Sequence, residues 1–173
     1  MKLKGKKIGI LVEDLYEDLE LWYPYYRLLE EGAEVKLIGP EAKIYKSKHG
    51  YPAEADLSAA EAKARDFQGI VVPGGYAPDR LRRYPKILDL VRKIFENGGL
   101  VASICHGPWV LISTNIMKGK HTTAMISLKD DLTNAGAIYL DQEVVVDNNL
   151  ITSRTPQDLP AFLPAIITAL QNK

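Results

Sequence analysis

Residues 100–108 of the chain read Leu-Val-Ala-Ser-Ile-Cys-His-Gly-Pro. The apolar run stops at Cys105, and a helical pattern with Trp109, Leu111 and Ile112 follows it. This order is typical of a nucleophile elbow, a sharp strand-to-helix turn that lifts one side chain off the sheet. The amides and the positive end of the following helix favour a thiolate there. We therefore predict that Cys105, the only cysteine, is an activated nucleophile rather than a small buried hydrophobe.

Outward from this turn, short apolar runs have the composition of strands buried on both faces of a parallel sheet. They cover residues 7–12, 35–38, 69–73 and 100–104. Two helical patterns lie between them, with apolar positions at Leu19, Trp22, Tyr26 and Leu29 and at Ile87, Leu90, Val91 and Ile94, the second closing at Asn97-Gly98-Gly99. The alternation predicts an α/β fold, a doubly wound, mostly parallel sheet sandwiched by helices.

Turn-forming residues predict a hairpin or an irregular excursion at residues 45–55 and a second hairpin at residues 144–152. The tail from Asp158 to Leu170 has a helical pattern, in which Pro164 is expected to kink the helix or to shift its start. No repeat, linker or low-complexity stretch interrupts the sequence. We expect residues 1–173 to form one domain.

The charge balance argues against nucleic acid as a partner. The 22 Lys and Arg residues equal the 22 Asp and Glu residues, so no global field concentrates a polyanion. The apolar stretch from Ile8 to Val12 is too short for a signal sequence or a membrane span. A single cysteine forms no internal disulfide, which agrees with a reducing compartment. We therefore expect a cytoplasmic protein that binds neither membranes nor nucleic acids.

Two further features belong to the same edge of the predicted sheet. His106 is the nearest base, yet neighbours at a strand end point in diverging directions, so contact between imidazole and sulfur needs an unusual backbone. The turn at Gly74 and Gly75 ends another buried strand, where open α/β sheets bind ligands. Gly74 and Gly75 are predicted to line a substrate and oxyanion site, with the Gly75 and His106 N–H groups as oxyanion donors.

An acidic cluster follows the first strand at residues 13–20. Most of it fits complementation of a helix dipole, and Asp14 with Glu17 suits a capping box. His49 and His121 stand alone in the sequence and are expected at the surface rather than on a metal. Phosphate-binding loops of the G-x-G-x-x-G or Walker type are absent from the sequence. We expect no metal and no cofactor.

Seven motifs, in order along nearly the whole chain, resemble those of the PfpI/ThiJ superfamily of intracellular cysteine hydrolases, within the class I glutamine-amidotransferase-like fold. They are Glu17-Asp-x-Glu20 before Tyr23-Pro24, Lys48-His-Gly50, Pro73-Gly-Gly-Tyr-Ala-Pro-Asp79, Ile104-Cys-His-Gly-Pro108, Asn134-Ala-Gly136, Asp141-Gln-Glu-Val-Val-Val-Asp147 and Ser153-Arg-Thr-Pro-x-Asp-Leu159. The resemblance implies a flavodoxin-like sheet.

Carried over residue by residue, the resemblance implies Cys105 as nucleophile and Glu17 as the carboxyl group that hydrogen-bonds its sulfur. In protease-like members an acidic residue at the position of Asp79 comes from a neighbouring subunit and orients the histidine, here His106. The expected partner is therefore a second copy of this chain, in a homodimer or higher homo-oligomer. Asp79 is one methylene shorter than the glutamate of some members, which shortens its reach.

The resemblance leaves three functions open. Residues 141–162 look closer to the stress-protein and deglycase branch, which implies a hydrolase acting on methylglyoxal or glyoxal, or on their adducts with proteins. A cysteine peptidase with a cross-subunit Cys-His-acid triad is the first alternative, although Met125 replaces a tyrosine found in some archaeal peptidase-like members. A redox sensor or chaperone with an oxidisable cysteine is the second. The resemblance does not extend to glutamine amidotransfer, because the amidotransferases need a late His-x-Glu pair and no histidine follows His121.

Overall fold

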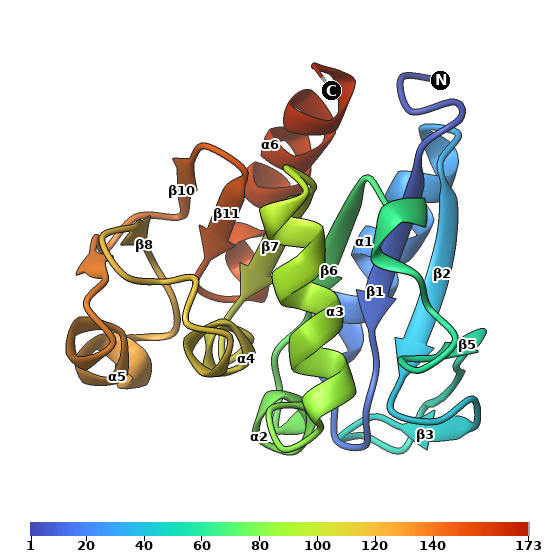
Figure 1. The fold of residues 1–173 in the computed structure, drawn as a ribbon, viewed down its shortest axis with the longest axis horizontal. Helices are drawn as coiled ribbons and strands as arrows, with labels where there is room; N and C mark the ends of the chain where they lie inside the picture. The colour runs from blue at the N-terminus through green and yellow to red at the C-terminus, as the bar shows by residue number, and fades with distance from the viewer. Residues whose placement is uncertain (173) are drawn as a thin grey trace.

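The buried apolar runs pair in a seven-stranded sheet, with the order β10-β11-β7-β6-β1-β2-β5, in the computed structural model, which describes residues 1–172 (Figure 1). Neighbouring strands are parallel except β10 and β11, which form an antiparallel pair. The predicted mostly parallel sheet is confirmed. Its strands are β1 (Lys7–Leu11), β2 (Glu34–Gly39), β5 (Leu57–Ser58), β6 (Gly69–Val72), β7 (Leu100–Ile104), β10 (Val144–Asp147) and β11 (Leu150–Ser153).

Helices cover both faces of the sheet. On one face, α1 (Asp18–Glu30) and α6 (Leu159–Gln171) pack against each other; on the other lie α2 (Ala77–Leu81), α3 (Pro85–Glu96) and α4 (Pro108–Ser113) (Figure 1). The apolar face predicted for the second helical pattern is confirmed, since α3 buries all four of the residues predicted for it. The remaining elements are the helix α5 (Lys129–Asn134), the pair β8 (His121–Thr122) and β9 (Ile138–Tyr139), and the 3₁₀ turns η1 (Ala64–Asp66), η2 (Ile126–Leu128) and η3 (Pro156–Asp158).

The order of the strands places a crevice next to β1. From β1 the chain moves outward to β2 and β5, then returns to the other side of β1 to form β6, β7 and β11. Ile8 is accordingly paired with Val35 on one side and with Gly69 on the other. Open α/β sheets bind ligands at such a reversal, outside the carboxyl ends of the strands. The loops after β1, β6 and β7 meet there.

Both predicted hairpins form, in different surroundings. β3 (Ile44–Lys46) and β4 (Pro52–Glu54) make a separate two-stranded sheet, while β10 and β11 extend the central one. The loop after β1 holds the first hairpin, because the Leu15 N–H donates to the Lys46 carbonyl at 2.7 Å. Helix α6 begins at Leu159 and continues through Pro164, so the expected shift of its start does not occur.

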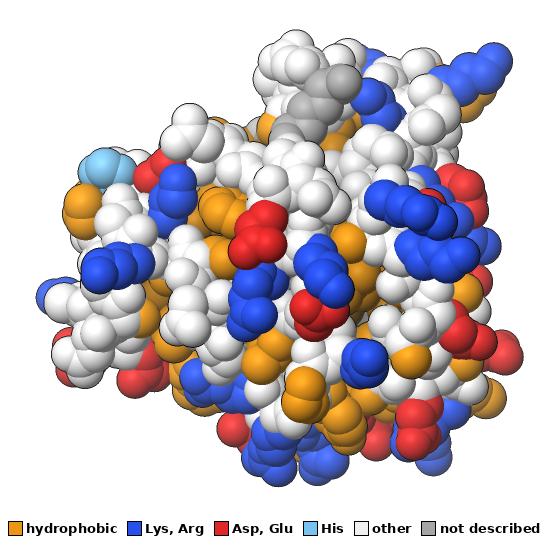
Figure 2. Space-filling view, in the orientation of Figure 1, with side chains coloured by type: hydrophobic (Ala, Val, Ile, Leu, Met, Phe, Trp, Pro, Cys, Tyr) orange, Lys and Arg blue, Asp and Glu red, His pale blue; other side chains and the backbone are white. Residues whose placement is uncertain are grey.

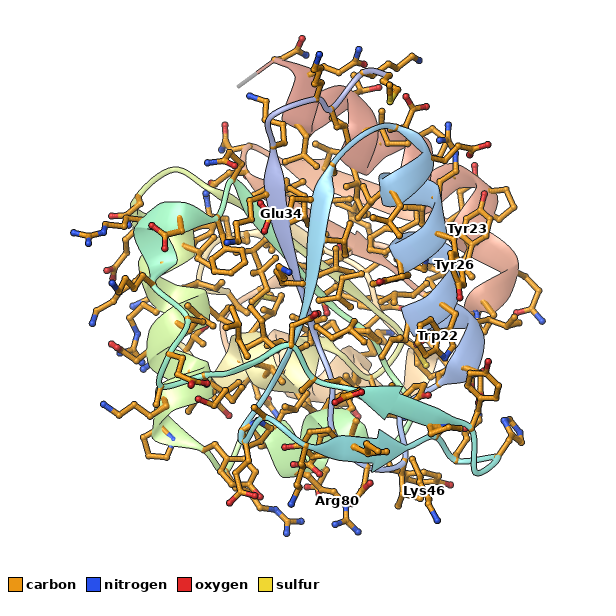
Figure 3. The ribbon with its side chains drawn as sticks, turned by 90° about the vertical axis from the view of Figure 1, so that its right-hand side faces the viewer. Trp22, Tyr23, Tyr26, Glu34, Lys46 and Arg80 are labelled. Atoms are coloured by element: carbon orange, nitrogen blue, oxygen red, sulfur yellow. The ribbon has the colours of Figure 1, made fainter. Side chains whose placement is uncertain are left out.

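The face that α1 buries differs from the predicted one. Its buried side chains are Glu20, Leu21, Pro24 and Leu28, whereas Leu19, Tyr26 and Leu29 of the predicted apolar face are exposed. Trp22 stacks on Tyr26 with ring centroids 5.9 Å apart and meets Tyr51 of the hairpin loop edge-on at 5.7 Å. Figure 3 shows Trp22, Tyr23 and Tyr26 along the outer side of this helix. Aromatic rings that cover one another take the place of burial in the core.

The charged side chains are mixed in sign over the visible face of the molecule. Figure 2 shows Lys and Arg interspersed with Asp and Glu, with hydrophobic side chains between them. This agrees with the balanced composition of the sequence. None of the helices within residues 1–172 combines the length and the apolar character needed to cross a bilayer.

Candidate active site

Cys105 occupies a strained turn between β7 and α4. Its backbone φ of 61° lies in the left-handed region, which residues other than glycine rarely adopt. Gly107 permits the turn, because a Cβ there would clash with the Val72 carbonyl and the Ser103 hydroxyl. The predicted strand-turn-helix geometry is therefore present, and it places the thiol at the carboxyl edge of the sheet.

The carboxyl group beside the sulfur is that of Glu20, and this corrects the predicted role of Glu17. The side chain of Glu17 pairs instead with the Lys48 ammonium. Glu20 is fully buried; its Oε2 accepts the Gly74 N–H at 2.7 Å, and its carboxyl interacts directly with the Cys105 thiol. The other oxygen, Oε1, has no conventional partner within residues 1–172, which leaves it free to take the thiol proton.

Glu20 and Cys105 titrate as a coupled pair. Burial raises the pKa of Glu20 to about 7, against the opposing effect of the Gly74 N–H. Burial and the Glu20 charge raise the pKa of Cys105 to about 12, although the His106 and Gly75 N–H groups lower it. This is opposite to the low cysteine pKa that the helix N-terminus predicted. Above about pH 7 the pair holds a single proton, so a thiolate exists when that proton lies on Glu20.

The raised pKa of Glu20 makes stability depend on pH. The folded state binds the Glu20 proton more tightly than the unfolded chain does. This proton therefore stabilises the fold fully below pH 4.5, and its contribution to the free energy of unfolding is lost as the pH rises through about 7. Glu20→Gln lacks this loss. Relative to the variant, wild type should lose up to about 3 kcal/mol of unfolding free energy between pH 4.5 and 8. Urea unfolding of both proteins across this range measures the difference, and parallel stability curves would contradict the expectation.

The left-handed turn also brings His106 onto the sulfur. Its Nδ1 lies 3.2 Å from the Cys105 Sγ, a contact that an ordinary strand end would not allow. The other ring nitrogen, Nε2, lies 3.3 Å from the hydroxyl of Ser127. Burial, followed by the charge of Lys48, lowers the pKa of His106, so the imidazole is neutral at neutral pH. The unusual backbone that direct contact requires is thus part of the fold.

The two glycines after β6 have different roles. The Gly75 N–H, like that of His106, is directed at the sulfur, where both stabilise negative charge. Gly75 adopts a φ of +77°, and a Cβ would lie 2.5 Å from the Leu15 carbonyl. The Gly74 N–H is occupied by Glu20, which corrects its predicted place beside the oxyanion donors. Gly74 instead makes room, since its Cβ would lie 2.7 Å from that of Cys105.

A cavity of about 250 Å³ opens over the thiol. Tyr76 and Met125 line it together with the charged pair of Glu17 and Lys48. Lys48 is placed by the hairpin loop, where its own N–H donates to the Tyr16 carbonyl at 3.0 Å. The complete lining is Glu17, Glu20, Lys48, Gly75, Tyr76, Cys105, His106, Met125 and Pro156. Segments from both halves of the chain thus enclose the Cys105 sulfur.

Asp79 does not belong to this lining within one chain. It lies in α2 and pairs with Arg83 in the turn after that helix. The cross-subunit role that the resemblance implies for Asp79 stays a prediction.

The acidic cluster has specific partners rather than a shared role at a helix end. Helix α1 has no side-chain cap, and the expected capping box is wrong: Asp14 accepts the Lys46 N–H at 2.8 Å instead. Asp18 contacts the exposed His49 at 2.7 Å, and His121 contacts Asp147 at 3.3 Å. In the part of the chain that the structure describes, no three His, Cys, Asp or Glu side chains group as a metal site.

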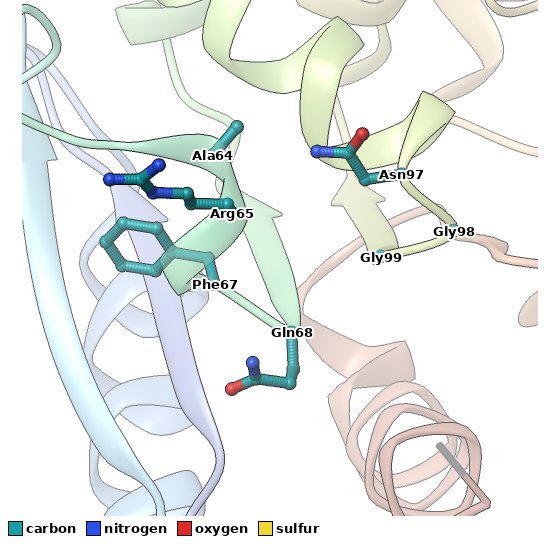
Figure 4. A pocket seen from close by; sticks show the side chains of 7 residues that line it. All are labelled: Ala64, Arg65, Phe67, Gln68, Asn97, Gly98 and Gly99. Carbon is teal, nitrogen blue, oxygen red and sulfur yellow. The ribbon is translucent and has the colours of Figure 1, made fainter.

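A second hollow, of about 380 Å³, lies away from this chemistry. It is formed near the amino ends of β6 and β7 by residues that include Arg65, Gln68 and Asn97 (Figure 4). Its complete lining is Ala64, Arg65, Phe67, Gln68, Asn97, Gly98 and Gly99, with no carboxyl, thiol or imidazole group among them. The thiol cavity is the better candidate for an active site.

Sequence reasoning missed Glu20, Lys48 and Ser127 as parts of this site. The spacing could have predicted that Glu20 is buried, because it precedes Pro24 and Leu28 at four-residue intervals along the buried face of α1. Lys48 was noticed only as part of a motif. Ser127 follows Cys105 by more than twenty positions and carries no pattern of its own.

The fold is a flavodoxin-like α/β sheet, and its cysteine lies in a strand-to-helix turn beside a carboxyl group and an imidazole. These features place the protein in the class of α/β proteins with a nucleophile elbow. The DJ-1/PfpI family model matches residues 6–169, nearly the whole chain. The chain belongs to the DJ-1/PfpI family.

Three similar proteins support this membership. The protein named deglycase PfpI of Pyrococcus furiosus is 44% identical over 165 residues, covering 95% of this chain and 99% of its own. A Bacillus subtilis protein, YraA, named as a candidate cysteine protease, is 44% identical over 91% of this chain and 94% of its own. An uncharacterized protein of Archaeoglobus fulgidus is 46% identical over 95% of this chain and 98% of its own.

Solved structures agree with the fold. A two-domain protein of Anabaena variabilis with DJ-1/ThiJ/PfpI-like and ferritin-like domains superimposes with a TM-score of 0.94 and 45% identity, covering 95% of this chain. This chain spans half of that longer one. DJ-1beta of Drosophila melanogaster superimposes with a TM-score of 0.90 and 31% identity, covering 97% of this chain and 91% of its own.

Proposed function

We propose that this protein is a cysteine hydrolase that acts on small dicarbonyls, such as methylglyoxal and glyoxal, and on their adducts with proteins. The observation that carries the proposal is the buried Glu20 carboxyl beside the Cys105 thiol, under two N–H groups directed at the sulfur. A thiol with a raised pKa needs a proton acceptor at hand, and Glu20 is placed to be one.

The chemistry needs only these groups and water. The thiol proton passes to Glu20, and the sulfur attacks the aldehyde carbon of methylglyoxal, forming a carbon–sulfur bond and an oxyanion that the Gly75 and His106 N–H groups stabilise. The hydrogen of the former aldehyde carbon moves with its bonding electrons to the ketone carbon, which oxidises the first carbon to a thioester and reduces the second to an alkoxide. Glu20 returns its proton to this alkoxide. Water then cleaves the carbon–sulfur bond, releasing lactate and the thiol. No external oxidant or reductant enters.

The dimensions of the site also favour a compact substrate. The cavity of about 250 Å³ is smaller than the roughly 300–1,000 Å³ typical of pockets for drug-sized ligands. A three-carbon dicarbonyl fits such a space, whereas a peptide would have to lie across its mouth. The 44% identical Pyrococcus relative is named a deglycase, which supports the same substrate class.

A peptidase is the second candidate, favoured by the 3.2 Å contact between Cys105 Sγ and His106 Nδ1. Cysteine and histidine in contact are the core of a thiol protease site. In this candidate, Asp79 of a second subunit orients His106, so the homo-oligomer is the active form. The name of the Bacillus relative supports it.

A comparison of substrates separates these candidates. Purified wild type should convert methylglyoxal and release the free thiol from a glycated thiol, with little cleavage of a fluorogenic peptide. Peptide cleavage that exceeds dicarbonyl turnover, and that Asp79→Ala abolishes, would replace the proposal by the peptidase. Selective oxidation of Cys105 by mild peroxide, seen by mass spectrometry without turnover of any substrate, would replace it by the redox sensor.

A further inference from the structure

Ser127 is exposed, and within residues 1–172 its hydroxyl is the one side-chain group that hydrogen-bonds the outer ring nitrogen of His106. Its Oγ lies 3.3 Å from Nε2, while Nδ1 on the other side of the ring lies 3.2 Å from the Cys105 sulfur. The three side chains therefore form a row, Ser127 to His106 to Cys105. Nothing in the sequence motifs or in the function proposed above uses the serine.

The backbone holds this row in place. Ser127 lies in the η2 turn, and the residue before that turn, Met125, donates its N–H to the Cys105 carbonyl at 3.1 Å. The Leu128 N–H in turn donates to the Met125 carbonyl at 2.9 Å, and the Leu128 side chain is fully buried. The backbone that carries the exposed Ser127 side chain is thus anchored within one chain to the same turn that presents the sulfur.

The helices α2 and α5, which pack against α4, each carry an acidic side chain that has a partner other than the His106 ring. Asp131 accepts the Trp109 indole N–H at 2.8 Å, and Trp109 packs edge-on against His106 with centroids 5.1 Å apart. Asp79 pairs with Arg83. Among residues 1–172, neither ring nitrogen of His106 bonds a carboxylate. The difference matters because an ionised carboxylate only accepts hydrogen bonds, whereas a hydroxyl both donates and accepts.

We propose that Ser127 is a positioning residue that donates its hydroxyl hydrogen to His106 Nε2 and so holds the ring in the tautomer whose Nδ1–H points at the Cys105 sulfur. This deepens, and rests on, the function proposed above. In this tautomer His106 donates a hydrogen bond to the thiolate that forms when Glu20 takes the proton.

An acid in the place of Ser127 would have the opposite effect. A carboxylate accepts Nε2–H and leaves Nδ1 as an acceptor for the thiol proton, which makes His106 the base. The serine arrangement makes Glu20 the base and His106 a donor. The neutral imidazole, which burial and the charge of Lys48 favour by lowering the pKa of His106, is the form in which the two tautomers differ.

The test reads the tautomer and the reactivity of the thiol without any substrate. Nitrogen-15 spectra at pH 8 report which ring nitrogen carries the proton, and the loss of signals in His106→Gln assigns the ring. The rate of Cys105 alkylation by iodoacetamide at the same pH reports the thiolate. Ser127→Ala removes the hydroxyl and Ser127→Thr keeps it. Ser58→Ala is the matched control, because the Ser58 hydroxyl bonds Glu61 at 2.7 Å near the far edge of the sheet.

We expect the Nδ1–H tautomer in wild type, Ser127→Thr and Ser58→Ala. Ser127→Ala should shift the ring toward Nε2–H and slow alkylation about threefold to tenfold, as expected for the loss of one hydrogen bond. An unchanged tautomer and alkylation rate in Ser127→Ala would overturn the proposal, as would an Nε2–H ring in wild type. The expected tautomer shift in a protein that converts no dicarbonyl would support the role of Ser127 and count against the proposed function alone.

Discussion

Cys105→Ala should abolish the conversion of methylglyoxal and of glycated thiols, lowering kcat by roughly four to six orders of magnitude. The proposed reaction forms its first covalent bond at this sulfur, and the chain has no second cysteine to replace it. Glu20, His106 and the N–H groups then surround an inert methyl group.

The variant should fold, because alanine keeps the Cβ and the same φ at the turn and removes only the sulfur atom. A thermal melt checks this, and Cys105→Ser supplies a second variant with a poor nucleophile at nearly the same position. Ser58→Ala, far from the cavity, should keep full activity. If Cys105→Ala retained even a tenth of wild-type turnover, the sulfur would not be the nucleophile.

Glu20→Gln should lower kcat by roughly 10²- to 10⁴-fold, the usual effect of losing a general acid–base group. The glutamine amide has nearly the same shape and can still accept the Gly74 N–H, but it takes no proton from the thiol. Wild-type activity should rise with pH through about 7, where the pair loses its first proton, and the variant should lack this limb.

Glu17→Gln is the matched control, three residues earlier in the same segment. It removes the ion pair with Lys48 but leaves the carboxyl beside the sulfur, so we expect less than about a tenfold effect. Steady-state kinetics across pH 5–9 compare the two variants. A severe loss in Glu17→Gln with near-normal rates in Glu20→Gln would reverse the two roles and restore the assignment based on sequence resemblance.

The resemblance to the family motif implied Glu17 as the carboxyl group beside the thiol, and the rotation of α1 explains why Glu20 lies there instead. The sequence places large apolar residues at Leu19, Trp22 and Tyr26, which predicts a buried face on that side. The aromatic rings cover one another on the outside instead, and the helix turns Leu21 and Pro24 into the core. Glu20 shares the inner face and is carried to the thiol, while Glu17 lies just before the helix and reaches the hairpin loop.

The direction of the shift in the pKa of Cys105 could also be determined only from the folded protein. A helix N-terminus lowers a cysteine pKa when the sulfur is exposed to water. Here the sulfur is largely buried and next to a second acidic group, so burial and the Glu20 charge outweigh the N–H groups. Neither burial nor a neighbour from another segment can be read from the residues that flank Cys105.

The sequence alone determined the parallel sheet, the second apolar helix face, both hairpins and the turn at Cys105, because each depends on the periodicity or turn chemistry of a few adjacent residues. The tertiary structure decided which groups touch the sulfur. Glu20, His106, Lys48 and Ser127 come together through the rotation of α1, the left-handed backbone of Cys105 and the docking of η2. Those contacts depend on packing between distant segments, and a linear pattern does not encode the angle at which two packed elements meet.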